Sequence, residues 1–180
     1  MPSSPMTAEE LLAHQPTHTR AELVRGRMVV REPGGFEHGR IAMRAALLLH
    51  DWLREHPIGE LLAAETGFTL ARDPDTVRAP DVAFLRAERV PSPAPRGFAE
   101  MAPDLAIEVL SPDARRGEVA AKFADWLDAG ATAVWIIDPM RRVGQIHRAG
   151  GELSLVHPGD AFRDDTLLPG FALPLDLLFA

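Results

Sequence analysis

Two almost continuous apolar segments, Asp104–Leu110 and Thr132–Ile137, constrain the fold of this chain more than any other feature of its sequence. Segments of this kind are typical of central strands that other elements cover on both faces. The intervening segment, Arg116–Ala129, has the apolar periodicity of a helix that packs along one side. A chain with such strands must place helices on both sides of a sheet, which predicts an α/β fold with a mixed α+β sheet.

The remaining patterns predict a central mixed β-sheet flanked by helices, with a hairpin towards each end of the chain. Glycine and proline residues separate the periodic segments and mark the turns between them. The start of the helix that ends at Ala129 stays open between Ser111-Pro112 and the neighbourhood of Gly117. The other predicted elements are a short helix (Ala8–Leu12), an N-terminal hairpin (Ala21–Arg31), a long helix (Phe36–His56), two strands (Glu60–Ala71 and Val77–Arg86) and a C-terminal hairpin (Val143–Arg148 with Glu152–His157).

The long helix has one apolar side, which is expected to face the sheet. Its inward stripe is predicted at Ile41, Ala45, Leu48 and Trp52, which follow one another at the spacing of helical turns. His38 lies three residues before Ile41. The histidine is therefore expected at the start of this stripe, as a helix-start or core residue rather than on the wet side.

Length and composition limit the classes of protein. A length of 180 residues is expected for one domain over 1–180, with a loose tail over 1–6 and a long proline-rich loop over 87–103. No apolar segment reaches the roughly 18 residues of a membrane span and no secretory signal is visible, so a cytoplasmic protein is expected. The absence of Cys excludes disulfides, iron–sulfur clusters and thiolate zinc sites. A net charge of −7 argues against a histone-like protein that coats nucleic acid, but not against an enzyme with a local contact patch.

Two acidic residues stand in or beside segments that are otherwise apolar. Asp81 comes directly before Val82–Leu85, and Glu108 interrupts the segment Asp104–Leu110. An ionised carboxylate in a buried strand is costly unless it is paired, hydrogen-bonded or bound to a metal. If the two strands are neighbours, the carboxylates can share a cation, and hard oxygen ligands favour Mg²⁺ or Mn²⁺.

Lys122 is the only lysine in a chain that has 18 arginines. It lies three residues after Val119 and four before Trp126, on or beside the apolar stripe of its predicted helix. An exposed lysine is readily replaced by arginine, whereas a compact ammonium in a tight site is not. We therefore expect Lys122 to point towards the sheet, with its ammonium within reach of Asp81 and Glu108. Together the three groups suit metal-assisted hydrolysis of a phosphodiester.

The ordered set of motifs resembles the Uma-two family of restriction endonucleases, a branch of the PD-(D/E)XK nuclease superfamily. The resemblance runs from Glu22 to Pro139, most of the chain. The segments that carry it are Glu22–Gly26, Glu37–Gly39, Ala79–Phe84, Pro103–Ser111, Lys122, Ala129-Gly130 and Val134–Pro139.

The resemblance implies a restriction-endonuclease-like core and a magnesium-dependent endonuclease that acts on DNA. It implies that Asp81 and Glu108 are metal ligands, together with the backbone carbonyl of Val109, and that Lys122 completes the catalytic set. In the superfamily's usual motif the lysine stands two residues after the glutamate, where this chain has Leu110. Lys122 matches a variant in which the lysine has moved to the next helix. Glu22 and His38 are accessory candidates, although Gly39 replaces the glutamine that family members often carry after the histidine.

Two other functions remain open at this stage. The chain could be a nuclease-fold module that binds nucleic acid without turnover, which suits the negative net charge and the lack of a basic stripe. It could also be an oligomeric accessory protein, in which Asp81, Glu108 and Lys122 form a buried ion-pair network. A homodimer would suit cleavage of two strands, and no sequence feature demonstrates one.

Overall fold

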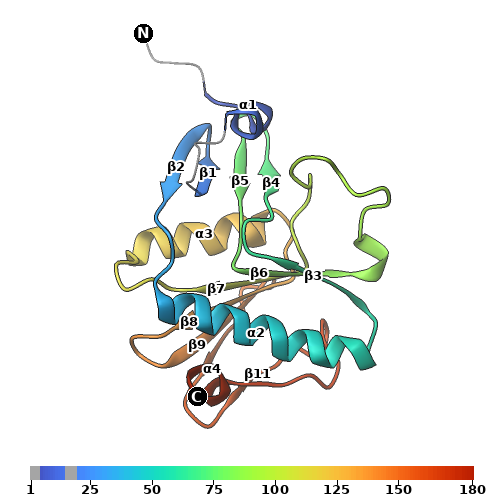
Figure 1. Cartoon of the computed structure of the whole chain (residues 1–180), viewed down its shortest axis with the longest axis vertical. Coiled ribbons are helices and arrows are strands. Elements are labelled where there is room, and N and C mark those ends of the chain that lie inside the picture. Colours follow the sequence, from blue (N-terminus) through green and yellow to red (C-terminus); the bar gives the residue numbers. More distant parts are fainter. Residues whose placement is uncertain (1–4, 15–19) are drawn as a thin grey trace.

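A computed structural model describes residues 5–14 and 20–180 (Figure 1). Its main element is a six-stranded mixed sheet with the order β10-β9-β8-β7-β6-β3. Strands β7 and β8 run parallel, and all other neighbours in this sheet are antiparallel. The strands are β3 (Gly59–Ala63), β6 (Val82–Arg86), β7 (Leu105–Val109), β8 (Ala133–Asp138), β9 (Val143–Arg148) and β10 (Leu153–Val156). Of the tail expected over 1–6, residues 1–4 lie outside the described part.

The two apolar segments form the centre of this sheet, as predicted. Every residue of β7 and β8 is buried. Because a parallel pair of strands needs a crossover between them, helix α3 (Arg116–Asp128) connects β7 to β8 and covers one face of the sheet. The later of the two expected starts for this helix is the observed one.

Helix α2 (Phe36–Glu55) covers the opposite face, so helices flank the sheet on both sides (Figure 1). Ile41 and Ala45 are fully buried, as predicted. The predicted stripe is wrong further along, because Leu48 and Trp52 are only partly buried and the helix buries Leu49 and Leu53 instead. The buried residues of α2 follow one another at every fourth position, so they turn slowly around the helix. The C-terminal segment packs beside α2 and covers this side of the helix. That segment contributes Phe162, Leu167, Leu168, Phe171, Leu173, Leu175, Leu178 and Phe179.

A second, smaller sheet with the order β2-β1-β5-β4 stands beside the main sheet (Figure 1). The predicted N-terminal hairpin supplies two of its strands, and the left-handed residues Arg25 and Gly26 form its turn. The strands are β1 (Arg20–Val24), β2 (Arg27–Arg31), β4 (Phe68–Ala71) and β5 (Thr76–Arg78).

The prediction of two long strands over Glu60–Ala71 and Val77–Arg86 is wrong. Each segment breaks in the middle, and its two halves join different sheets: β3 and β6 the main sheet, β4 and β5 the small one. The first break contains Glu65, which has a left-handed backbone. The second break is Ala79-Pro80-Asp81, where proline removes a donor from the ladder. These two breaks bend the chain from one sheet to the other, and the second one sets the position of Asp81.

The remaining elements follow the predicted order. Helix α1 (Ala8–Ala13) begins with a capping box of Thr7 and Glu10. Strands β9 and β10 form the expected C-terminal hairpin. The other short elements are η1 (Ala87–Arg89) in the proline-rich loop, β11 (Ala161–Phe162), β12 (Leu173–Pro174) and α4 (Leu175–Phe179). Within the described residues, no helix has the length and apolar character needed to cross a membrane.

Candidate active site

The candidate site lies where β6 begins and β7 ends. The antiparallel register pairs Val82 with Ile107, so that Asp81 and Glu108 come next to each other across the two strands. The backbone N–H of Asp81 donates to the Ile107 carbonyl at 3.1 Å, and Oδ2 of Asp81 accepts from the Val109 N–H at 2.8 Å. Backbone pairing thus holds Asp81 against the end of the neighbouring strand.

Helix α3 supplies both hydrogen bonds to the Glu108 carboxylate. Lys122 Nζ donates to Oε2 at 2.8 Å, and Trp126 Nε1 donates to Oε1 at 3.0 Å. The two donors are four residues apart, so they lie one turn apart on the same side of the helix. Since Glu108 is 9% exposed, these two bonds satisfy a carboxylate that has little access to water.

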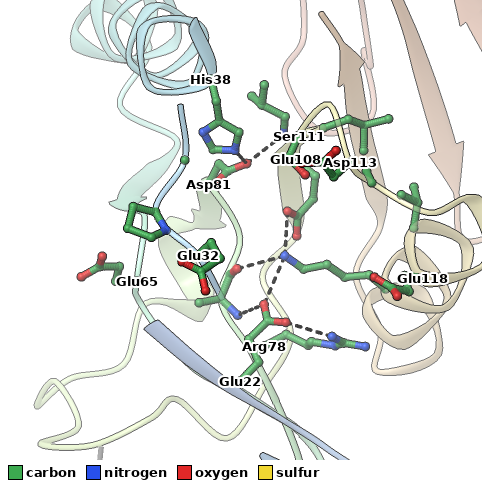
Figure 2. A pocket seen from close by; sticks show the side chains of 18 of the residues that line it. Glu22, Glu32, His38, Glu65, Arg78, Asp81, Glu108, Ser111, Asp113 and Glu118 are labelled. Atoms are coloured by element: carbon green, nitrogen blue, oxygen red, sulfur yellow. Dashed lines mark hydrogen bonds and ion pairs between the residues drawn. The ribbon is translucent and has the colours of Figure 1, made fainter. Parts of the chain in front are cut away.

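The ammonium of Lys122 lies between three acceptors from different parts of the chain. Besides Glu108, it donates to the Ala79 carbonyl at 3.3 Å and lies 3.2 Å from Oε1 of Glu22 (Figure 2). The expectation that Lys122 points towards the sheet is confirmed. Its direct carboxylate partners are Glu108 and Glu22, whereas it acts on Asp81 through its charge.

His38 contacts Asp81 from the other side of the sheet. Its Nε2 lies 3.2 Å from Oδ2 of Asp81, and the ring sits in the first turns of α2 above the cleft (Figure 2). A Cβ on Gly34 would come within 2.7 Å of the His38 ring, so the glycine leaves the space that the ring occupies. The five residues singled out in the sequence (Glu22, His38, Asp81, Glu108 and Lys122) therefore come together in one place.

Sequence reasoning missed two residues of this cluster, Trp126 and Arg78. Trp126 looked like an ordinary core residue of the helix stripe, and its indole N–H has no signal of its own in the sequence. Arg78 is 3% exposed and donates to Glu22 at 2.9 Å and to Asp125 at 3.0 Å. One signal was available for Arg78, because it directly precedes the Ala79-Pro80-Asp81 motif inside an apolar strand.

Burial and neighbouring charges shift the ionisation of the central groups. Burial raises the pKa of Glu108 to about 7, and the Asp81 and Glu22 carboxylates act in the same direction against the Lys122 ammonium. Burial alone would raise the pKa of Asp81, but the hydrogen bond and charge of His38 bring it below its usual value. Burial opposes the charge of Lys122, yet the carboxylates of Glu108 and Glu22 hold its pKa above the usual value. Burial is therefore the largest cause of the raised pKa of Glu108, and the neighbouring carboxylates add a smaller effect.

These residues line one cleft of about 950 Å³. Acidic side chains dominate its wall and rim, as Figure 2 shows, and the basic residues among its lining are Arg78, Arg115, Lys122 and His38. The acidic members are Glu22, Glu32, Glu65, Asp81, Glu108, Asp113 and Glu118.

The donor atoms of this cleft fit a hard divalent cation in chemistry and charge. Two carboxylates and a strand-end carbonyl are oxygen ligands of the kind that Mg²⁺ and Mn²⁺ prefer. Burial, the largest cause of the raised pKa of Glu108, opposes the ionised carboxylate, which a bound cation would stabilise. In the described part of the chain, no three His, Asp or Glu side chains already lie together as a ligand set. Lys122, Trp126, His38 and the Val109 N–H hold the carboxylates instead.

Comparison with known proteins identifies the family of the chain and a crystal structure with the same fold. The family model Uma2, described as "Putative restriction endonuclease", matches residues 8–176. The chain belongs to the Uma2 family. A crystal structure from Anabaena variabilis, described as a "putative nuclease belonging to DUF820", has the same fold, with a TM-score of 0.85 and 22% sequence identity over 97% of this chain and 98% of that one. A search among curated proteins gave no match. The description of the family supports a nuclease function for this Uma2 chain.

Proposed function

We propose that the protein is a divalent-metal-dependent endonuclease that hydrolyses phosphodiester bonds in DNA. The observation that carries the proposal is the 2.8 Å contact between Lys122 and Glu108. The lysine stands on helix α3 and the glutamate on strand β7, yet the fold brings the two side chains together. The cluster also places the Asp81 and Glu108 carboxylates at the ends of neighbouring strands, as two ligands of one divalent cation would lie. Family membership supplies the class of reaction.

In this proposal Asp81, Glu108 and the carbonyl of Val109 hold Mg²⁺ or Mn²⁺. An ion held there would supply Lewis-acid chemistry, which activates water and offsets charge on the phosphate. His38 and the Val109 N–H fix the Asp81 carboxylate, and Trp126 fixes that of Glu108. These bonds hold the ligands in place before the ion binds, which lowers the cost of ordering them.

Lys122 acts as a charged hydrogen-bond donor. Since the neighbouring carboxylates hold its pKa above the usual value, the side chain stays protonated at neutral pH and cannot accept a proton. An ammonium has three donors, and Glu108, Glu22 and the Ala79 carbonyl occupy them, so in this proposal Lys122 exchanges one of these acceptors for the attacking water or a phosphate oxygen. Glu22 contacts the ammonium of Lys122, and Arg78 holds Glu22 in place by a hydrogen bond.

Nicking of supercoiled plasmid DNA tests this proposal directly. We expect wild-type protein to nick the plasmid in Mg²⁺ or Mn²⁺ and to stop when EDTA is added. Asp81→Asn removes one ligand charge, and we expect activity to fall at least ~100-fold, as is usual when a group that acts on the transition state is lost. Asp128→Asn is the matched control, because Asp128 is exposed at the end of α3. Equal nicking by wild type and Asp81→Asn, with bound metal verified, would contradict the assignment.

The network of buried ion pairs around Lys122 and Arg78 also suits a second candidate function. Arg78 forms ion pairs with Glu22 and Asp125, and Lys122 pairs with both Glu22 and Glu108. Such a network can be structural, in a binding or accessory protein without turnover. Isothermal titration separates the two functions: the nuclease binds Mg²⁺ or Mn²⁺ with a loss of affinity in Asp81→Asn, whereas the accessory protein shows no uptake of either ion.

A further inference from the structure

Helix α2 presents an apolar face to the outside. Phe36 is 88% exposed, Met43 58% and Leu47 52%, although each is a large hydrophobic residue. They lie on the side of the helix that is turned away from the buried residues Ile41 and Ala45. Figure 1 shows α2 on the near side of the molecule with no element in front of it. An apolar patch along one exposed helix is typical of an interaction surface.

The residues of this face recur at the spacing that helices use when they pack against each other. Steps of four and three residues alternate without a break over five steps. This is the period of a helix seam that faces a second helix. The outer seam consists of Phe36, Arg40, Met43, Leu47, His50 and Arg54. Its apolar middle, Met43 and Leu47, has basic residues on both sides, and Phe36 extends the seam at the start of the helix.

We infer that a second copy of this chain covers the outer seam, with the two α2 helices antiparallel about a two-fold axis near Ala45 and Ala46. In a two-fold interface each residue meets a fixed counterpart in the other copy. Here Met43 faces Leu47 of the partner subunit, and the same pair occurs again across the axis. The four side chains form a continuous apolar centre. A helix of 20 residues is about 30 Å long, so the seam is long enough for a specific contact.

The charges along α2 favour this orientation. With the axis near Ala45 and Ala46, Arg40 comes opposite Asp51 of the partner subunit, and Glu37 comes opposite Arg54 of the partner subunit. Phe36 also lies next to the partner's Arg54, where a guanidinium can stack on the ring. A parallel pair would set Arg40 against the partner's Arg40. The contact of Arg40 with Glu37 in its own helix is 3.9 Å long, so it competes weakly for the arginine.

The edge strand β10 is the main competing surface. Leu153 is 54% exposed and Leu155 is 57% exposed, so this strand displays two apolar side chains to a similar extent. The patch covers only a four-residue strand, whereas the outer seam of α2 extends over more than four turns. Along α2, a two-fold axis also brings residues of opposite charge next to each other, such as Arg40 and Asp51 of the partner subunit. Leu155 therefore provides a matched control for Leu47.

Sedimentation velocity over a range of protein concentrations tests the inference. We expect wild-type protein to be a dimer at micromolar concentrations, Leu47→Asp to be a monomer, and Leu155→Asp to remain a dimer. Circular dichroism and thermal melting verify that each variant is folded, which is expected because both side chains are on the surface. A monomeric wild type at about 100 µM, well above the dissociation constant of a specific dimer, would overturn the inference. Dissociation by Leu155→Asp with a dimeric Leu47→Asp would also overturn it.

A charge exchange tests the orientation. Arg40→Asp and Asp51→Arg each place like charges opposite each other twice in the dimer, and we expect each to weaken dimerisation by roughly tenfold or more. The double variant Arg40→Asp/Asp51→Arg restores opposite charges across the axis, and we expect it to dimerise about as well as wild type. If the double variant is as weak as the sum of the two single variants, the antiparallel pairing is wrong. Neither residue belongs to the proposed nuclease site, so these results are independent of whether the protein cuts DNA.

Discussion

At the scale of single residues, Lys122 is the most informative side chain in the molecule. It reaches two carboxylates and a carbonyl from a helix, and it is the only lysine in the sequence. Arginine carries the same charge on a larger, planar group that cannot fit the same three acceptors. The lysine count predicted the inward position. It could not reveal Glu22 as the second carboxylate partner, because that contact depends on how the two sheets are placed.

Two replacements of Lys122 should separate the effect of its positive charge from the effect of its side-chain shape. We expect Lys122→Arg to keep most of the stability, since a cation still faces Glu108 and Glu22, but to lose at least ~100-fold of the nicking activity. Lys122→Met leaves the buried Glu108 carboxylate without its cation, while Arg78 still pairs with Glu22, and we expect the variant to unfold more easily by about 3 kcal/mol. Plasmid nicking and urea denaturation measure the two effects. Full activity in Lys122→Arg would show that the site needs only a positive charge there.

Trp126 should act on the site through Glu108. Trp126→Phe keeps an aromatic ring next to Phe68 but removes the N–H that donates to Oε1 of Glu108. We expect a loss of about 1–3 kcal/mol in the free energy of unfolding, because a buried acceptor loses its donor. We also expect nicking to require a higher pH, since the ionised form of Glu108 loses a stabilising bond. Trp52→Phe is the control, because Trp52 stacks on His56 at the far end of α2. An unchanged pH profile in Trp126→Phe would limit the indole to packing.

The ionisation of Glu108 should make stability depend on pH in an unusual direction. Its pKa in the folded protein is about 7, above its ordinary value, so the folded state binds the proton more tightly than the unfolded state does. The cost of ionising the buried group is absent at low pH and grows as pH rises through 7. The lowered pKa of Asp81 acts in the opposite direction, but only in acid below its ordinary value of 3.8.

Glu108→Gln removes this cost and keeps an acceptor for Lys122. We expect the variant to gain stability relative to wild type as the pH is raised from about 5.5 to about 8.5, as urea unfolding at each pH would measure. Addition of Mg²⁺ should reduce the difference, since the proposed ion stabilises ionised Glu108. A difference that is constant with pH would mean that Glu108 has no raised pKa.

At the scale of elements, the sequence predicted best where one pattern determines one element. The apolar segments of β7 and β8 and the periodicity of α2 and α3 each require burial on known sides, and these elements appear where expected. The prediction of one continuous strand in each of the segments 60–71 and 77–86 was wrong because both halves of each segment have a strand-like sequence. Only the tertiary arrangement assigns the two halves to different sheets. The same limit explains Arg78, whose partners Glu22 and Asp125 come from β1 and α3.

The edge of the main sheet depends on Gly59 at the start of β3. A Cβ on this residue would lie 2.1 Å from the backbone carbonyl oxygen of Leu85, and backbone cannot move aside cheaply. We expect Gly59→Ala to lower the free energy of unfolding by about 2 kcal/mol or more, as strand β3 must shift away from β6. Gly117→Ala is the matched control, because its Cβ meets open space in the first turn of α3 and alanine favours helix. Equal stability of the two variants in urea would contradict the tight contact at β3.

At the scale of the whole molecule, charge opposes the proposed substrate. The chain has a net charge of −7, and acidic residues outnumber basic ones in the lining of the cleft. DNA is a dense polyanion, and proteins that bind it without metal usually do so through clustered Lys and Arg. A nuclease with this surface must therefore depend on cations both for the reaction and for the approach of the phosphate.

DNA binding should accordingly depend on a divalent cation before any bond is cut. We expect fluorescence anisotropy with labelled DNA to show little binding in EDTA and a clear gain in Ca²⁺, which occupies oxygen sites like those of Mg²⁺. Glu118→Gln removes one rim charge from the cleft without touching the central carboxylates, and we expect it to strengthen binding at low salt but not at high salt. Glu55→Gln, an exposed change at the other end of α2, is the control. Tight binding in EDTA would mean that DNA attaches away from the acidic cleft, so the carboxylates that set the chemistry would not govern recognition.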